Sequence, residues 1–275
     1  MIELTERNLS NVIVKRPRNS HKGSFGRVVI VGGNAEYGGA AILAATAAVY
    51  AGSGLVTVAC HLSNHAALHA RLPEAMVIDF DDLSALTEVL SVADVVVIGC
   101  GLGLERLDLL TEVLSALTGT QKLVIDGSAI TLFSENNLKL RFPQNTIFTP
   151  HEMELQRLSG LKIGCQYADS VQKFVNQLGA MVVAKSPETK VFSPSQETYF
   201  LTIGTPAQAT GGMGDTLAGI IGGFLAQFHG EVHETVAAAT YLHSFIAHDL
   251  ATSQYVVLPS QIIEQLPKMM KRFEC

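Results

Sequence analysis

Residues 27–60 read RVVIVGGNAEYGGAAILAATAAVYAGSGLVTVAC, and this stretch decides the fold. Arg27–Val31 and Leu55–Cys60 are short β-branched runs, which are typical of buried strands. Between them lie a glycine-rich turn and an alanine-rich segment, residues 40–52, with the composition of a helix. The stretch therefore predicts one β-α-β unit, whose two strands run parallel.

The same alternation continues along the rest of the chain. Further strands are expected at Val77–Phe80, Asp94–Gly99, Leu123–Asp126, Thr146–Phe148 and Met181–Lys185. Helices are expected near residues 84–91, 105–117, 152–159 and 166–178, then at Asp215–Gln227, at Val232–Asp249 and in an amphipathic tail from Pro259. KVFSPSQETYFL predicts a β-hairpin that turns around Ser193–Gln196. Apolar strands alternating with helices predict an α/β/α sandwich, in which a mainly parallel sheet carries helices on both faces.

The composition bounds the class of protein. Only 16% of the 275 residues are charged and 48% are hydrophobic, which excludes a disordered chain, a coiled coil and a charged linker. No linker or repeat interrupts the chain, so we expect one domain over residues 1–275. No window approaches 18 uninterrupted apolar residues and no secretory signal is evident, which predicts a soluble cytoplasmic protein without a membrane partner.

Charge and cysteine content exclude two further classes. The net charge of −6 comes with no basic patch, so a nucleic-acid partner is not expected. The four cysteines, Cys60, Cys100, Cys165 and Cys275, are widely spaced and form no CxxC pair. Three of them lie in apolar or helical contexts, which predicts buried, reduced thiols rather than disulfides or a zinc site.

Glycines gather in three loops that follow predicted strands or lead into a predicted helix. The members are Gly32, Gly33, Gly38 and Gly39; Gly99, Gly101 and Gly103; and Gly211, Gly212 and Gly214. In a parallel α/β sheet, ligands bind at the carboxyl ends of the strands, where such loops lie. Tight turns would explain any one cluster, but three at one edge favour a nucleotide or polyphosphate ligand.

The third cluster belongs to residues 204–215, GTPAQATGGMGD, which lead directly into an apolar helix. Backbone N–H groups of Gly211, Gly212, Met213 and Gly214, together with the helix N-terminus, predict an anion hole. Asp215 would repel a phosphate there unless it removes a proton from an attacking hydroxyl group. We therefore interpret Asp215 as a general base, with a plain helix cap as the alternative.

Several of these segments resemble known enzymes. TGGMGDTLAGII, residues 210–221, resembles the signature of ribokinase-like kinases, in which a glycine-rich anion hole precedes a catalytic aspartate. Four segments in order resemble the NAD(P)H-hydrate dehydratase family of that superfamily. They are residues 22–59, residues 97–103 (VIGCGLG), residues 148–158 (FTPHEMELQRL) and residues 204–219.

The resemblance implies a metabolite-repair reaction. Enzymes of this family use ADP in bacteria, or ATP in eukaryotes, to dehydrate the S epimer of hydrated NADH or NADPH. Phosphorylation of the ring hydroxyl, with ADP converted to AMP, makes it a leaving group, and elimination restores the coenzyme. The stand-alone bacterial type, which this chain resembles, works beside a separate epimerase, and the resemblance suggests a homotetramer.

The resemblance also implies site residues. Ala40, Gly103, His151 and Asp215 match positions that contact the hydrate, with Asp215 as the base. Lys185, Ser186, Pro187, Glu188, Thr189 and Gly214 match the adenine nucleotide site. No acidic metal cluster is evident, so we expect Mg²⁺ to be held by phosphates and water rather than by protein ligands. Ser186 stands where the family usually has glycine and Met213 where threonine is frequent, which bears on nucleotide preference and rate.

Other motifs fail on spacing. Gly99–Gly103, with Asp126 ending the next strand, imitates a dinucleotide-binding fingerprint, but Leu104 and Arg106 occupy the positions that need glycine. HEMEL, residues 151–155, is not a zinc-protease motif because Leu155 replaces the second histidine. His151 follows a strand end and is placed to touch a ligand, although capping the next helix would explain it too.

His61, His65 and His69 are spaced to share one helix face. No cysteine or carboxylate cluster adjoins them, so a solvated helix surface is favoured over a metal site.

Two other functions use the same residues. A kinase for a vitamin precursor would need the same anion hole and Asp215, but residues 32–45 and the Gly99–Gly103 loop match the dehydratases better. A non-catalytic nucleotide-binding regulator is suggested only by Ser186 and Met213. The retention of Asp215 argues against it, since a pure binder would gain by losing that charge.

Overall fold

The computed structural model describes residues 1–275 and contains one ten-stranded sheet in the order β1-β10-β9-β8-β7-β6-β5-β2-β3-β4. The strands are β1 Ile2–Glu3, β2 Arg27–Val31, β3 Leu55–Cys60, β4 Met76–Asp79, β5 Val95–Ile98, β6 Lys122–Ile125, β7 Thr146–Phe148, β8 Met181–Ala184, β9 Lys190–Phe192 and β10 Tyr199–Phe200. All neighbouring strands are parallel except for β9, which runs antiparallel to both β8 and β10. The mainly parallel sheet and the hairpin are thus confirmed.

Eleven α-helices and four short 3₁₀ turns connect the strands. The helices are α1 Glu6–Val12, α2 Gly38–Tyr50, α3 His65–Arg71, α4 Leu83–Ser91, α5 Leu107–Ala116, α6 Gly127–Glu135, α7 Glu152–Ser159, α8 Ala168–Leu178, α9 Met213–Gln227, α10 Val232–Ala251 and α11 Pro259–Phe273. The turns are η1 Lys22–Phe25, η2 Leu62–Asn64, η3 Pro143–Asn145 and η4 Pro206–Gln208. No helix combines the length and the apolar character needed to cross a membrane.

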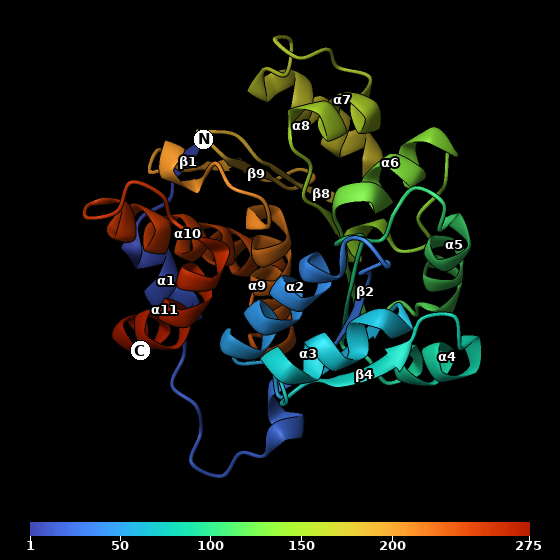
Figure 1. Ribbon diagram of the computed structural model, residues 1–275. Coiled ribbons are helices and arrows are strands. Elements are labelled where there is room, and N and C mark those ends of the chain that lie inside the picture. The colour runs from blue at the N-terminus through green and yellow to red at the C-terminus, as the bar shows by residue number, and fades with distance from the viewer.

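Helices cover both faces of the sheet, as the alternation of side chains along each strand requires. Val28 and Ile30 of β2 belong to one buried cluster, which includes residues of α1, α2, α9, α10 and α11. Val29 and Val31 belong to the other, which includes residues of α4, α5, α6, α7 and α8. Figure 1 shows these two groups of helices on either side of the strands.

The contact between α2 and α9 is unusually close. A Cβ atom on Gly219 of α9 would lie 2.1 Å from the carbonyl oxygen of Ala44 on α2, so only glycine fits there. The alanine-rich face of α2 is the matching half of this contact, with Ala44, Ala47 and Ala48 fully buried. This packing holds the N-terminal end of α9 against the loop that follows β2.

The two ends of the chain meet. Helix α1 lies against α10 and α11 (Figure 1), and β1 pairs with β10 at the edge of the sheet. Neither β1 nor α1 was expected from the sequence, and α6 was missed as well. The two ends are therefore part of the same packed structure as the β-α-β unit.

Two expectations about cysteine and histidine need correction. Cys60 and Cys100 are buried, but Cys165 and Cys275 are exposed, so two thiols are buried where the sequence predicted three. His61 precedes α3 and its Nδ1 accepts a hydrogen bond from the Ser63 N–H, so it does not share a helix face with the other two histidines. A turn after β3 breaks the spacing that suggested one continuous helix.

Candidate active site

The glycine-rich loops after β2 and β5 lie side by side at the carboxyl edge of the sheet. The Gly33 N–H donates to the Cys100 carbonyl at 2.9 Å, and the Asn34 N–H donates to the Gly101 carbonyl at 2.7 Å. Gly99 has a φ of +122°, and a Cβ atom on it would lie 1.8 Å from the Asp126 carbonyl oxygen. Glycine here allows the loops to close on one another.

A cavity of about 740 Å³ opens between these loops. Its lining contains few hydrophobic side chains and comes from the loops after β2, β3, β4, β5 and β6, with Asp215 of α9 at its wall: Asn34, Ala35, Glu36, Tyr37, His61, Phe80, Gly99, Gly101, Gly103, Leu104, Glu105, Arg106, Gly127, Ser128 and Asp215. Of the residues matched to the hydrate, Gly103 and Asp215 line it directly. Ala40 lies behind, packed against the Gly101 backbone. We call this space the acceptor cavity.

Asp215 is the third residue of α9, and the N-cap position belongs to Gly212, whose φ is +95°. The helix has no side-chain cap, so the interpretation of Asp215 as a plain helix cap is not supported. Burial raises the pKa of Asp215 to about 6, and the nearby negative charge of Asp126 adds to the rise. A carboxylate with such a pKa can accept a proton near neutral pH.

A second cavity, of about 210 Å³, lies on the other side of the N-terminal turn of α9. It is lined by Lys185, Ser186, Thr189, Leu201, Gly204, Gln208, Met213, Gly214, Leu217, Thr240, His243 and Ser244. We call it the donor cavity. Four residues matched to the nucleotide site meet here, namely Lys185, Ser186, Thr189 and Gly214. Pro187, Glu188 and Gly212 do not line it, although each adjoins a residue that does, and Gly211 does not line it either.

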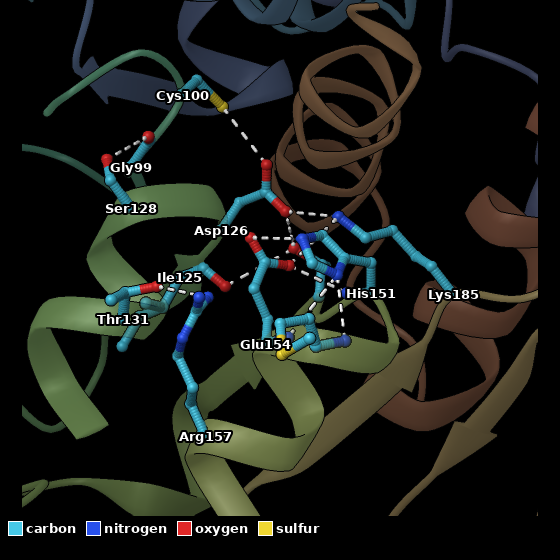
Figure 2. A network of polar contacts seen from close by, with 12 residues as sticks. Gly99, Cys100, Ile125, Asp126, Ser128, Thr131, His151, Glu154, Arg157 and Lys185 are labelled. Atoms are coloured by element: carbon cyan, nitrogen blue, oxygen red, sulfur yellow. Dashed lines mark hydrogen bonds and ion pairs between the residues drawn. The ribbon is translucent and has the colours of Figure 1, made fainter. Parts of the chain in front are cut away.

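Lys185 links the donor cavity to a buried ionic network, drawn in Figure 2. Its Nζ lies 2.9 Å from Asp126 Oδ1 and 4.0 Å from a carboxylate oxygen of Glu154. Burial alone would lower the pKa of Lys185, but these two carboxylates raise it overall. A Cβ atom on Gly214 would lie 3.0 Å from this Nζ, so the ammonium group lies directly beside the proposed anion hole.

Asp126 is the centre of that network. It lies at the end of β6 and is 3% exposed, and its Oδ1 accepts hydrogen bonds from Thr149 Oγ1 at 2.5 Å and from Lys185. Burial raises the pKa of Glu154 to about 7, against the effect of the Lys185 ammonium. In the sequence, Asp126 stands out only as part of the spacing that imitates a dinucleotide-binding fingerprint, and no motif contains Glu154 as a predicted site residue. The placement of Asp126 at a strand end, beside a glycine loop, was the available signal.

His151 has a structural role in addition to any contact with a ligand. Its Nδ1 accepts the Met153 N–H at 3.1 Å, and its own N–H donates to Glu154 at 2.8 Å, so it caps α7. An isolated parallel bridge pairs it with Lys185. Burial and the Lys185 charge lower the pKa of His151, which keeps the ring neutral at pH 7. His151 lies beside the network and does not line either cavity.

Cys100, Asp126 and Asp215 place one ligand atom each within 4.8 Å of one another, a grouping the sequence did not reveal. This donor set does not fit Mg²⁺. Asp126 is already paired with the Lys185 ammonium, and burial holds the pKa of the Cys100 thiol well above its usual value, so the sulfur stays protonated. Mg²⁺ prefers oxygen ligands and usually keeps phosphates and waters around it.

Comparison with known proteins agrees with this geometry. The family model for NAD(P)H-hydrate dehydratase matches residues 28–268. An ADP-dependent (S)-NAD(P)H-hydrate dehydratase from Lactococcus lactis is 67% identical, over 100% of both chains. A crystal structure of a ribokinase-like superfamily protein from Enterococcus faecalis superposes with a TM-score of 0.98 at 49% identity, covering 100% of this chain and 96% of the other.

A more distant structure has the same fold. It is an ADP/ATP-dependent NAD(P)H-hydrate dehydratase from Bacillus subtilis, co-crystallised with ATP and Mg²⁺, with a TM-score of 0.86 at 24% identity over 99% of both chains. The α/β architecture is therefore ribokinase-like, as the glycine-rich segment before α9 predicted. Given the family match over most of its length and the 67% identity to a full-length relative, the chain belongs to the NAD(P)H-hydrate dehydratase family.

Proposed function

We propose that this protein dehydrates the S epimer of hydrated NADH or NADPH in a reaction driven by ADP. The observation that carries the proposal is the position of two consecutive residues of α9. Asp215 lines the acceptor cavity, and Gly214 lines the donor cavity on the other side of the same helical turn. A base for a hydroxyl group and a binding site for a phosphoryl group therefore adjoin each other. The name of the Lactococcus relative supports the choice of substrates.

The reaction needs two steps. Asp215 takes the proton of the ring hydroxyl in the acceptor cavity, and the oxygen attacks the terminal phosphorus of ADP, which leaves as AMP. The phosphate ester then eliminates inorganic phosphate while the neighbouring ring carbon loses a proton to solvent, and the double bond of the dihydronicotinamide is restored. Phosphorylation is required because hydroxide is a poor leaving group and phosphate is a good one. The pKa of about 6 keeps Asp215 mostly ionised at pH 7 and still able to accept a proton.

Backbone N–H groups and one lysine stabilise the negative charge of the phosphates in the donor cavity. The N–H groups of Met213 and Gly214, the first two residues of α9, have no intrahelical partner. Together with the N–H groups of Gly211 and Gly212 they form the proposed anion hole. Lys185 supplies a positive charge beside it, as phosphoryl transfer requires. Since the protein groups near Asp215 do not fit Mg²⁺, the nucleotide phosphates and water would hold the ion, which would neutralise phosphate charge; the Bacillus relative was co-crystallised with ATP and Mg²⁺.

The remaining matched residues have supporting roles. We assign Ala40, Gly103 and His151 to the hydrate, and Ser186, Pro187, Glu188 and Thr189 to the nucleotide. The loop Ser186–Thr189 is closed by its own hydrogen bonds, with the Thr189 Oγ1 donating to the Ser186 carbonyl at 2.9 Å. A separate epimerase supplies the S epimer, the protein acts in the cytoplasm, and it assembles as a homotetramer.

The assay follows absorbance at the dihydronicotinamide wavelength with purified S hydrate, Mg²⁺ and either ADP or ATP. We expect absorbance to return only when nucleotide is present, with one phosphate released per coenzyme restored and with ADP the better nucleotide. With a mixture of the S and R epimers, the reaction should stop at the S fraction until an epimerase is added. Nucleotide consumption with a vitamin precursor, and none with the hydrate, would overturn the proposal.

A further inference from the structure

Helix α10 forms one wall of the donor cavity. Thr240, His243 and Ser244 face the cavity from this helix, opposite Lys185 and Gly214. None of the three was singled out by the sequence, because they lie within a helix that is apolar along most of its length. The Thr240 hydroxyl is already used within the helix, since it donates to the Val236 carbonyl at 2.8 Å.

His243 is different from its neighbours because its ring has an unused polar atom. The residue is 5% exposed, and its Nε2 is buried and has no hydrogen-bond partner. Most buried polar atoms in proteins are paired, and an unpaired one costs about 1–3 kcal/mol. His233 on the same helix is equally buried, and its Nε2 lies 3.5 Å from the Val191 carbonyl oxygen. His243 lines the donor cavity, so a ligand bound there would supply the hydrogen-bond partner that this nitrogen lacks.

The charge state of His243 indicates which part of a nucleotide it would meet. Burial lowers the pKa of His243 to about 4, and the Lys185 charge acts in the same direction, so the ring is neutral at pH 7. A neutral imidazole nitrogen donates or accepts one hydrogen bond, according to the tautomer. It offers a phosphate no net charge, whereas Lys185 and the amides of α9 do. Leu201 and Leu217 add apolar surface to the same cavity.

These features fit a nucleoside. Adenosine has both donors and acceptors on its base and ribose, and its flat ring packs well on apolar side chains. We propose that His243 is a specificity-determining residue of the nucleotide site and that its Nε2 hydrogen-bonds the adenosine part of ADP. The proposal depends on the proposed function only in taking the donor cavity as the nucleotide site.

The test compares two ligands, ADP and pyrophosphate, by titration calorimetry with the full chain. Pyrophosphate occupies the phosphate subsite and lacks adenosine. His243→Phe retains an aromatic ring and removes the nitrogen, so ADP affinity should fall about 10-fold while pyrophosphate affinity stays unchanged. His243→Asn, which restores a polar group, should recover part of the loss. His233→Asn is the matched control on the same helix and should bind both ligands like the wild type.

Wild-type ADP affinity in His243→Phe would overturn the proposal, and so would an equal loss for ADP and pyrophosphate, which would place the ring at the phosphates. Far-ultraviolet circular dichroism checks that each variant is folded. If His243→Phe does not fold, His243→Asn decides, because an altered ratio of ADP to pyrophosphate affinity is still required. The binding experiment needs no hydrate. An inactive wild type that binds ADP would therefore defeat the proposed function without touching this inference.

Discussion

Asp215 is the residue on which the chemistry depends most. It lines the acceptor cavity, and no other carboxylate of the buried network does so. We expect Asp215→Asn to lower kcat by about 10²–10⁴-fold, because a general base acts in the transition state. The ADP dissociation constant should change little, since the side chain faces away from the donor cavity. Steady-state kinetics and calorimetry on the same preparation measure both, and near wild-type kcat would remove Asp215 from the mechanism.

Burial sets most of the pH range of that base, and the Asp126 charge adds to it. Asp215 works only when ionised, so kcat/KM for the hydrate should fall as pH drops through about 6. Asp126 raises the pKa of Asp215, and Asp126→Asn removes that negative charge while it retains an oxygen that can accept from Thr149. The acid limb of the profile should therefore move to lower pH. A pH–rate profile of the variant tests this, and a limb that stays in place or rises would contradict it.

Some site residues could be predicted from the sequence and others could not, and the difference depends on whether the residues that act together are neighbours in the chain. Asp215 and Gly214 were found because the glycine-rich motif and the helix it precedes are contiguous. Asp126 and Lys185 are 59 residues apart, and only the pairing of β6, β7 and β8 brings them together. His243 is notable because no protein group hydrogen-bonds its Nε2. That property exists only once the whole helix is packed.

At the scale of elements, the close packing of α2 on α9 should be the most sensitive helix contact. Gly219→Ala would press a methyl group into the Ala44 carbonyl, which lies 2.1 Å from the added carbon, so the helices must separate. Overpacking of this kind costs about 1–3 kcal/mol, and the backbone partner places this case at the upper end. Gly230→Ala, where nothing lies within 4 Å, is the control and should be neutral within about 0.5 kcal/mol. Urea unfolding of both variants gives the comparison, and equal midpoints would refute it.

The elements that sequence predicted are those whose pattern is local. Strands such as Arg27–Val31 and the helices between the strands each show a characteristic spacing of apolar residues over a short stretch of sequence. Tertiary contacts did not change these elements. Strand β1 has two residues and exists through its pairing with β10, nearly 200 positions away, so no local pattern indicates it. Only Asp126 separates helix α6 from β6, and the first residue of the helix is Gly127, with a φ of +51°. The apolar pattern of the strand therefore passes almost directly into that of the helix, with no polar loop to mark where the helix begins.

At the scale of the molecule, the two cavities share one rigid divider. The N-terminal turn of α9 carries Asp215 on one side and Gly214 on the other, and α9 is itself buried from Thr216 to Gln227 between α2, α10 and the sheet. Packing on all sides fixes that turn relative to both ligands. The reacting groups are therefore held in position before either substrate arrives, which lowers the entropic cost of reaction. The donor cavity should therefore bind nucleotide even when the acceptor cavity is empty.

That independence makes a prediction about the stability of the whole chain. A ligand that binds only the folded state stabilises it by RT ln(1 + [L]/Kd), so ADP at 100 times its Kd should add about 2.7 kcal/mol. For a chain of this size that corresponds to an unfolding midpoint raised by about 5 °C. The same shift is expected in Asp215→Asn, at its own Kd multiple and without hydrate, because the donor cavity is unchanged. Thermal unfolding followed by circular dichroism, with and without ADP, gives the measurement. A wild-type midpoint that ADP does not move would mean that the donor cavity holds no nucleotide, whereas a shift lost only in Asp215→Asn would mean that the two cavities are coupled through α9.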